Sequence, residues 1–520
     1  MWRVRLVGSL MPGSRRVYAV HAACIRGVEA FPVTVEVSAS GTIPGLTIVG
    51  MADAAVQEAR VRIRCALRAS DFEIPRCALT VSLAPGDVRK TGSGFDLPIA
   101  VAILALTNQI PVAGLDDYLF AGELGLDGSV NAVSGEVAYQ LLARDNALSF
   151  AGGQSGTHVP VQGVACGILS HIGHLRLGIE AALGIPASTE VPADSSAPPL
   201  DYGDVVGQEI AKRGIAVAAA GGLGMLMIGS PGSGKTMLAK RMTTILPPLD
   251  EDERQEALCV HSVLGEPVDS LLRGERPFRS PHHSVSVAGL VGGGRPVHPG
   301  EISLAHGGVL YLDELGEFPS TSLQMLRQPI EEGSIRVVRV DGAFTFPARF
   351  QLIAASNPCP CGYLGDRDIA CRCSDAAIER YRMKLGGPLA DRIDLIVDVA
   401  RPDPDLIVRG AEGKTSSELL EDVVRGREFR SWRVASRRGG DGHDGSTSID
   451  AAIASQDLSN EGKTALLEIA KRKHLTGRGI VRLARIARTI ADMAESQAIE
   501  PAHLMEASLL QGRRGDGEAC

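Results

Sequence analysis

The stretch Gly229-Ser-Pro-Gly-Ser-Gly-Lys-Thr236 decides the fold of the central part of the chain. It matches the pattern G-x-x-x-x-G-K-[ST], in which glycines let the backbone wrap closely around phosphates. The flanks agree, because residues 223–228 are typical of a buried strand and residues 236–242 of a helix start. This context predicts an ATP-binding α/β core. The residues expected to hold the nucleotide are Gly229, Ser230, Pro231, Gly232, Ser233, Gly234, Lys235 and Thr236.

Length and composition indicate an ordinary globular protein of about two to four domains. The net charge of -8 over 520 residues excludes a globally basic surface, so nucleic-acid binding would need local patches. The uncharged run 214–229 is interrupted by glycines, which argues against a membrane span. The N-terminus is too weakly apolar for a secretion signal. We therefore expect a cytoplasmic protein without a membrane partner.

Four regions follow from the pattern of residues along the chain. Residues 1–185 mix predicted strands (33–37 and 78–83) with predicted helices (54–69 and 97–106). Residues 186–203 are rich in Pro, Ser and Asp and indicate a linker. Residues 204–400 carry the nucleotide motifs, and residues 401–520 are mainly helical, interrupted by a glycine-rich run at 437–448 that we expect to be a mobile loop.

Two further strands end in polar residues suited to nucleotide hydrolysis. The run 308–312 is apolar and ends in Asp313 and Glu314. Asp313 is expected to bind Mg²⁺ together with Thr236, and Glu314 to orient and deprotonate the attacking water. The buried run 350–356 ends in Asn357, whose amide could hold that water against the γ-phosphate.

The order of these motifs resembles that of AAA+ ATPases. Within AAA+ the chain is similar to the magnesium-chelatase-like branch and, over about residues 17–510, to the YifB/ComM family. The runs that carry the resemblance are Arg276-Pro-Phe-Arg-Ser-Pro-His-His-Ser284, Pro299-Gly-Glu-Ile-Ser-Leu-Ala-His306, Asn357-Pro-Cys-Pro-Cys-Gly362, Gly387-Pro-Leu-Ala-Asp391-Arg392-Ile-Asp394 and Ala487-Arg-Thr-Ile-Ala-Asp492. One departure is Gly222-Leu-Gly224, which stands where the family usually has Gly-His-Asn beside the nucleotide.

The resemblance implies an AAA+ core made of a parallel sheet with helices on both faces, and a C-terminal helical lid. It also implies a homo-hexameric ring with the nucleotide between subunits. It assigns Arg392 as the arginine finger, which reaches a neighbour's γ-phosphate and is worth about 10³-fold or more in rate. Arg380 and Arg382 are alternatives. Arg478 matches the family's second sensor on the lid, with Arg485 as the alternative.

Two inserts bear on the substrate. Residues 335–346 alternate around Asp341-Gly342 and predict a β-hairpin, which in related ring motors projects into the central pore. Arg336 and Arg339 could then contact DNA phosphates, or could be a solvated face. The insert 276–306 is rich in Gly, Pro and His, fits no standard metal-ligand spacing, and is expected to be a mobile pore or interface loop.

Four cysteines lie within fifteen residues after the predicted sensor strand. Four thiolates from two short turns can bind zinc tetrahedrally, although the spacing here is CxC rather than CxxC. Free thiols or a redox pair are the alternatives. The candidate zinc ligands are Cys359, Cys361, Cys371 and Cys373.

The N-terminal block resembles the proteolytic domain of Lon, which uses a Ser-Lys dyad. The match places Gly94 at the serine position and Val137 at the lysine position, and Ser93 lacks a matching lysine. We expect the Lon-like α+β fold without protease activity.

The leading functional hypothesis is an ATP-driven DNA motor, because proteins of the ComM type promote branch migration during natural transformation. An arginine-rich stretch could add positive charge for DNA, or could be a solvated helix face. Its members are Arg425, Arg427, Arg430, Arg433, Arg437 and Arg438. The alternative is a chelatase-type ATPase that remodels a protein or metal-inserting partner.

Overall fold

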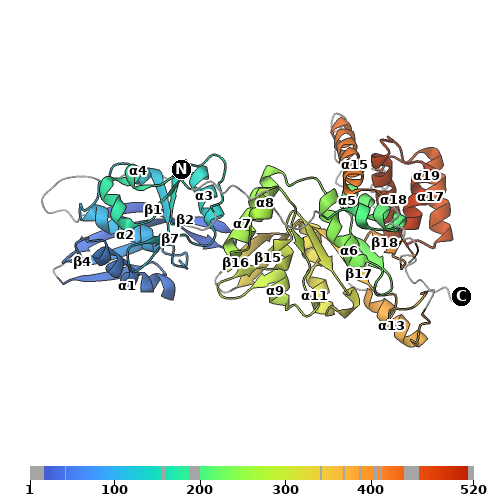
Figure 1. Cartoon of the computed structure of the whole chain (residues 1–520), viewed down its shortest axis with the longest axis horizontal. Coiled ribbons are helices and arrows are strands. Elements are labelled where there is room, and N and C mark those ends of the chain that lie inside the picture. The colour runs from blue at the N-terminus through green and yellow to red at the C-terminus, as the bar shows by residue number, and fades with distance from the viewer. Residues whose placement is uncertain are drawn as a thin grey trace.

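The computed structural model describes residues 17–40, 43–154, 158–186, 200–339, 342–366, 369–385, 389, 392–401, 405, 408, 413–437 and 456–512. These residues form three parts in a row: an N-terminal part, a central part and a C-terminal group of helices (Figure 1). Most of the expected linker 186–203 and of the expected mobile loop 437–448 lies outside the described residues, as do Asp341, Asp391 and Arg438.

The N-terminal part is built on a seven-stranded sheet with the order β3-β4-β2-β1-β5-β8-β9. Alternating Val33, Val35 and Val37 are buried because successive side chains of a strand point to opposite faces. The sheet strands are β1 (Val17–Arg26), β2 (Glu29–Ser40), β3 (Gly45–Val49), β4 (Ala78–Ala84), β5 (Tyr118–Ala121), β8 (Ser149–Gly152) and β9 (Cys166–Ile168), and β6 (Glu123–Leu124) pairs with β7 (Val130–Asn131). The helices are α1 (Ala54–Ala69), α2 (Asp96–Leu106), α3 (Glu136–Asp145) and α4 (Ile179–Ala182).

The central part is a five-stranded sheet in which every neighbouring pair is parallel. Its strands are β11 (Phe278–Arg279), β14 (Val309–Leu312), β17 (Gln351–Ser356), β10 (Met225–Ile228) and β18 (Leu395–Asp398), in that spatial order. Numbered by chain position, the order is 2-3-4-1-5, so the strand before the phosphate-binding loop lies between the fourth and fifth strands. Ligands bind outside the carboxyl ends of such strands, which places the predicted site at that edge.

Helices cover this sheet and give the central part a mixed α/β fold. They are α5 (Glu209–Gly221), α6 (Lys235–Lys240), α7 (Glu251–Leu264), α8 (Asp269–Leu272), α9 (Val287–Val291), α10 (Glu301–Leu304), α11 (Ser320–Met325), α12 (Arg327–Glu332) and α13 (Asp375–Leu385). The short strands β12 (Gly292–Gly293) and β13 (His298–Pro299) pair within the Gly- and His-rich insert. The predicted parallel sheet with flanking helices is confirmed, whereas the Lon-like assignment of the N-terminal part stays a prediction.

The C-terminal group packs against α5 of the central part and shares one apolar core with it. Its helices are α15 (Ser416–Arg437), α17 (Asn460–Arg472), α18 (Gly477–Met493) and α19 (Pro501–Leu510). The buried carboxylate of Asp492 accepts two hydrogen bonds from Arg433, both 2.9 Å long, and lies 3.0 Å from Arg488. Helix α15 is therefore tied to α18 by a buried ion pair as well as by apolar packing.

The predicted hairpin is present as β15 (Ser334–Arg339) and β16 (Gly342–Pro347), which pair antiparallel. Its two faces differ, because Ile335, Val337 and Phe346 are buried on one face while Arg336 and Val338 are exposed on the other. Arg339 is exposed at the tip of the hairpin, on the same face as Phe346. A Cβ added to Gly27, in the β1–β2 turn, would lie 3.2 Å from the Phe346 ring. The hairpin thus packs its apolar face toward the N-terminal part, between β1–β2 and the central sheet (Figure 1).

Candidate functional site

The phosphate-binding loop connects β10 to α6 at the carboxyl edge of the central sheet. Gly232 and Gly234 have φ values of 79° and 89°, which a residue with a Cβ rarely adopts. The Lys235 ammonium is folded into the loop, where it donates to the carbonyl oxygens of Gly229 at 2.7 Å and Ser230 at 3.1 Å. Burial lowers the pKa of Lys235, and the nearby carboxylates of Asp313 and Glu314 oppose that shift.

The acidic residues after β14 face the start of α6. The Thr236 hydroxyl donates to Asp313 Oδ2 at 2.9 Å and lies 3.2 Å from the buried Tyr311 hydroxyl. A hydroxyl beside a carboxylate is a pair of hard oxygen ligands, which fits Mg²⁺. Burial raises the pKa of Tyr311, so this phenol stays neutral beside the pair. Tyr311 could not be predicted as part of the site, because a tyrosine inside an apolar strand looks like any core residue.

Glu314 occupies an unusual backbone conformation at the predicted catalytic position. Its φ of 51° lies in the left-handed region, which is strained for a residue with a side chain. Its side chain is about half exposed, and its Oε2 lies 3.8 Å from Nδ1 of His283 in the insert. The His283 ring packs against His282 and Phe318, with ring centroids 4.0 Å and 6.4 Å away. No sequence motif joins His283 to Glu314, because 31 positions of chain separate them.

Asn357 follows β17 and completes the group at the carboxyl edge. Its Oδ1 accepts a hydrogen bond of 3.4 Å from the Lys235 ammonium. Strand β17 lies between β14 and β10, which brings Asn357 between the acidic residues and the loop. The structure therefore gathers Lys235, Thr236, Asp313, Glu314 and Asn357, as the sequence predicts, at one edge of the sheet.

Arg392 lies at the opposite, amino edge of the same sheet. It precedes β18, whose first residue Leu395 pairs with Met225 at the start of β10. The four residues of β10 separate the two edges by about 13 Å. The guanidinium of Arg392 forms an ion pair with Glu331.

Other positive groups gather around Arg392. Burial lowers the pKa of Arg392, and the neighbouring charges of Arg327, Arg478 and Arg485 lower it further. Arg485 also forms an ion pair of 3.2 Å with Asp394. Arg485 therefore lies at the amino edge beside the candidate finger, and the charge of Arg478 also acts on Arg392.

The run Gly222-Leu-Gly224, which departs from the usual Gly-His-Asn of the family, also lies at the amino edge. Gly224 N–H donates to Asp394 Oδ2 at 3.2 Å, and its carbonyl accepts from the Asp394 N–H at 2.8 Å. A Cβ at position 224 would lie 2.5 Å from the Arg392 carbonyl oxygen. Gly224 therefore lies beside Arg392 and Asp394, at the amino edge of the sheet.

The arginines of α15 make contacts within the chain. Arg427 donates to the Ala219 carbonyl at 2.7 Å, and burial lowers its pKa to about 10. Arg433 forms an ion pair with Asp492, and Arg425 forms one with Asp422. Arg430 lies 3.4 Å from the Gly221 carbonyl. Arg427, Arg430 and Arg433 therefore fasten α15 to the core, whereas Arg425 pairs within the helix. Much of the free positive charge that the sequence suggested there is thus engaged within the chain.

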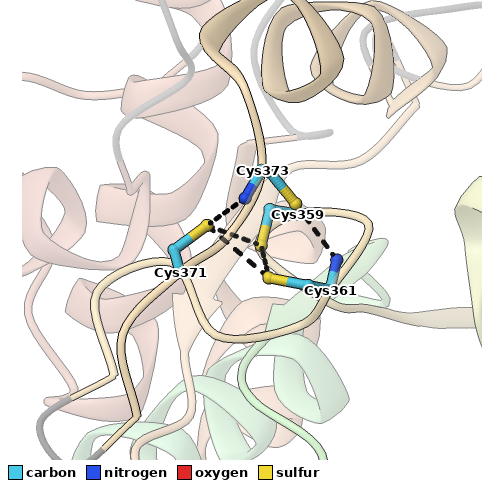
Figure 2. Close-up of side chains that lie close together, drawn as sticks. All are labelled: Cys359, Cys361, Cys371 and Cys373. Carbon is cyan, nitrogen blue, oxygen red and sulfur yellow. Dashed lines mark hydrogen bonds between the residues drawn. The ribbon is translucent and has the colours of Figure 1, made fainter.

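The four candidate zinc ligands lie close together after β17 (Figure 2). Cys359 Sγ is 3.4 Å from Cys361 Sγ and 3.7 Å from Cys371 Sγ. All four sulfur atoms, including that of Cys373, lie within 4.8 Å of one another. Among the described residues they are the one group of three or more His, Cys, Asp or Glu close enough to share an ion, so the histidines of the insert form no such group.

The insert itself is fastened to its surroundings. Arg279 pairs with Glu266, which precedes the insert, at 3.3 Å, and forms a bidentate ion pair with Glu301 near the other end of the insert, with distances of 2.8 Å and 2.9 Å. His306 is fully buried, and its Nδ1 accepts a hydrogen bond of 3.1 Å from the Arg349 N–H. The expectation of a mobile loop is therefore wrong for the two ends of the insert, since both are anchored by buried or paired side chains.

No Ser-Lys dyad forms at the Lon-like positions. Val137 is fully buried, and a Cβ at Gly94 would lie 3.3 Å from the Tyr139 hydroxyl. Ser93 donates to Glu123 Oε2 at 2.5 Å, and a carboxylate partner is not the amine that the dyad needs. The buried Lys90 ammonium donates to the Pro85 carbonyl.

No helix within the described ranges is both long and apolar enough to span a membrane.

Comparisons with known proteins identify the family of the chain. Three family models match: subunit ChlI of magnesium chelatase over residues 35–150, magnesium chelatase subunit ChlI over 201–406, and the ChlI C-terminal region over 413–511. The chain is 39% identical to the uncharacterized protein YifB of Escherichia coli and 38% identical to the competence protein ComM of Haemophilus influenzae. Each alignment covers 94% of this chain and 96% of the relative. A magnesium-chelatase 67 kDa subunit of Chlorobaculum parvum is 31% identical over 30% of this chain and 23% of its own length. The chain therefore belongs to the YifB/ComM family of magnesium-chelatase-like AAA+ ATPases.

Proposed function

We propose that this protein is an ATP-hydrolysing ring motor that acts on DNA. The evidence for a ring motor is that the candidate ATPase site is divided between the two edges of one sheet. Lys235, Thr236 and Asp313 lie at the carboxyl edge, whereas Arg392 lies at the amino edge, about 13 Å away along β10. An arginine that serves a γ-phosphate from the amino edge must therefore serve a neighbouring subunit, and head-to-tail contacts of this kind close into rings. A homo-hexamer is the ring that we propose.

The residues at the carboxyl edge can divide the work of hydrolysis. Loop N–H groups and the Lys235 ammonium hold the phosphates, and Thr236 and Asp313 would hold Mg²⁺, which neutralises charge on the phosphate oxygens when bound. Glu314 would accept the proton of the attacking water, and Asn357 would keep that water in line. The arginine of the neighbour would stabilise charge in the transition state.

The DNA part of the proposal rests on family and on surface charge. The Haemophilus influenzae relative is named a competence protein, which is a context of DNA uptake. On the hairpin, Arg336 is exposed on the face opposite to the packed one, and Arg339 is exposed at the tip, so these two guanidinium groups are our candidates for contact with a phosphate backbone. We propose that DNA passes this hairpin and that branched or single-stranded DNA is the substrate. The proposed location is the cytoplasm.

DNA is expected to bind in a salt-dependent way and to stimulate ATP hydrolysis. The measurement is ATPase rate and DNA affinity at several salt concentrations, with forked and single-stranded DNA. Arg336→Ala combined with Arg339→Ala should weaken binding and reduce the salt slope by about 0.7 for each lost contact to single-stranded DNA. The matched control is Arg60→Ala with Arg64→Ala, which removes the same charge from exposed positions on α1 and should leave the slope unchanged.

The alternative is a chelatase-type ATPase that remodels a protein or metal-inserting partner, which the partial match to the Chlorobaculum parvum subunit supports. An ATPase rate indifferent to every DNA tested, together with unchanged binding in the hairpin variant, would favour that alternative.

A further inference from the structure

The four cysteines after β17 have the spacing of a tetrahedral metal site (Figure 2). The sulfur separations among Cys359, Cys361 and Cys371 are 3.4 Å, 3.6 Å and 3.7 Å. Four thiolates bonded to zinc at about 2.3 Å would lie about 3.8 Å apart. The observed separations are close to this value and far from the about 2.0 Å of a disulfide bond. Two arms of the chain, one with Cys359 and Cys361 and the other with Cys371 and Cys373, supply the sulfurs.

Backbone N–H groups turn toward these sulfurs. The Cys361 N–H donates to Cys373 Sγ at 3.3 Å, and the Cys373 N–H donates to Cys371 Sγ at 3.5 Å. Such contacts around a metal site orient its ligands and stabilise their negative charge. Cys359 is fully buried and the other three cysteines are partly exposed, so the cluster lies just beneath the surface.

The segment that carries the cysteines needs a cross-link to hold a shape. Between Ser356, which ends β17, and Asp375, which begins α13, the described residues form no helix or strand. Connections of this length without secondary structure are uncommon in compact domains and usually have a function. A bound metal can supply the folding free energy that a short irregular segment cannot obtain from an apolar core.

The same segment touches the phosphate-binding loop. Gly362 has φ of 86°, and a Cβ there would lie 2.7 Å from Pro231 Cδ, so only glycine permits this approach. Asn357, two residues before Cys359, accepts a hydrogen bond from Lys235. Asn357 and Gly362 therefore join the cysteine segment to the phosphate-binding loop. After Cys373 the segment leads into α13.

We propose that Cys359, Cys361, Cys371 and Cys373 bind one structural zinc ion, which holds Gly362 against the phosphate-binding loop and keeps Asn357 in place. Soft thiolate ligands in tetrahedral geometry select zinc or iron over Mg²⁺, and the structural role favours the redox-inert ion. The metal site does not depend on the proposed action on DNA. Its effect on turnover rests on the proposed ATP hydrolysis.

Metal content tests the site itself. Full-length protein is expected to hold about one zinc ion per chain, as a four-thiolate site requires, in elemental analysis and in native mass spectrometry. Cys361→Ser with Cys373→Ser should lose the ion, whereas Cys65→Ser with Cys77→Ser, free cysteines of the N-terminal part, should keep it. If the first variant does not fold, release of one zinc from the wild-type protein by a mercurial thiol reagent gives the same information. Metal-free protein with four reactive thiols in the cluster would overturn the proposal, and so would iron.

The ATPase rate of the Gly362→Ala variant tests the contact with the phosphate-binding loop separately from metal binding. This variant keeps all four ligands and is expected to retain zinc, while its new methyl group presses on Pro231. We expect kcat for ATP hydrolysis to fall by about 10- to 100-fold, the usual effect of disturbing a residue that positions a site. Zinc retained with unchanged kcat would overturn the positioning role alone. An inactive wild-type protein with full zinc content would instead count against the proposed ATPase function.

Discussion

Replacing Glu314 by Gln is expected to lower kcat for ATP hydrolysis by about 10²- to 10⁴-fold, the usual contribution of a general base. ATP affinity should change little, because Glu314 lies beside the phosphate-binding loop and makes none of its hydrogen bonds; its Oε2 faces His283 at 3.8 Å. The measurements are steady-state ATPase rates and equilibrium binding of a fluorescent ATP analogue. Glu317→Gln is the matched control, since Glu317 is exposed three residues later and should retain wild-type kcat.

Lys235→Ala, unlike Glu314→Gln, should lose ATP affinity. The Lys235 ammonium is held by Gly229 and Ser230 within the loop, and its charge-assisted bonds to phosphate would be worth about 1.5–3 kcal/mol. ATP binding should therefore weaken by about 10- to 100-fold. Equal loss of binding in the Glu314 and Lys235 variants would contradict the separate roles assigned to them.

Replacing Arg392 by Ala is expected to lower kcat by about 10³-fold or more, because the finger arginine stabilises charge in the transition state. ATP binding should persist, since Arg392 lies at the amino edge, remote from its own loop. Arg380→Ala and Arg382→Ala serve as controls and test the two alternatives. Both residues are exposed on α13, whose Tyr381 contacts Ser356 at the carboxyl edge, so they lie on the other side of the sheet from Arg392.

Mixing two inactive variants tests whether Arg392 acts on a neighbour. Lys235→Ala subunits keep Arg392, and Arg392→Ala subunits keep Lys235. In rings of randomly mixed subunits, about a quarter of the head-to-tail interfaces combine both intact residues, and activity should recover accordingly. Failure of every mixing ratio to restore ATPase activity, with mixed assemblies demonstrated by size, would contradict action between subunits.

Much of the fold could be predicted because its signals are local. The helix predicted at 54–69 is α1 with the same ends, and the runs before the phosphate-binding loop, Asp313 and Asn357 are the strands β10, β14 and β17. Their convergence followed from one rule, that the carboxyl ends of parallel strands share an edge. The hairpin was predictable because Asp341-Gly342 separates two alternating runs.

The parts of the site that could not be predicted depend on packing between distant segments, which no local sequence pattern encodes. The contact of His283 with Glu314 and the clustering of Arg478 and Arg485 around Arg392 arise from the way the insert and α18 fold back. The arginines of α15 show the same limit of sequence-based prediction. A charged helix face has the same sequence pattern whether it contacts DNA or, as with Arg427, a buried carbonyl group.

The central claim, a motor driven by ATP that acts on DNA, is tested most directly by moving a branch point. Purified protein is given a three-stranded DNA substrate with ATP and Mg²⁺, and release of the displaced strand is followed in time. The account predicts release by the wild-type protein, none by Lys235→Ala or Glu314→Gln, and strongly reduced release by the Arg336→Ala, Arg339→Ala variant. An active ATPase that leaves every branched substrate unmoved would contradict it.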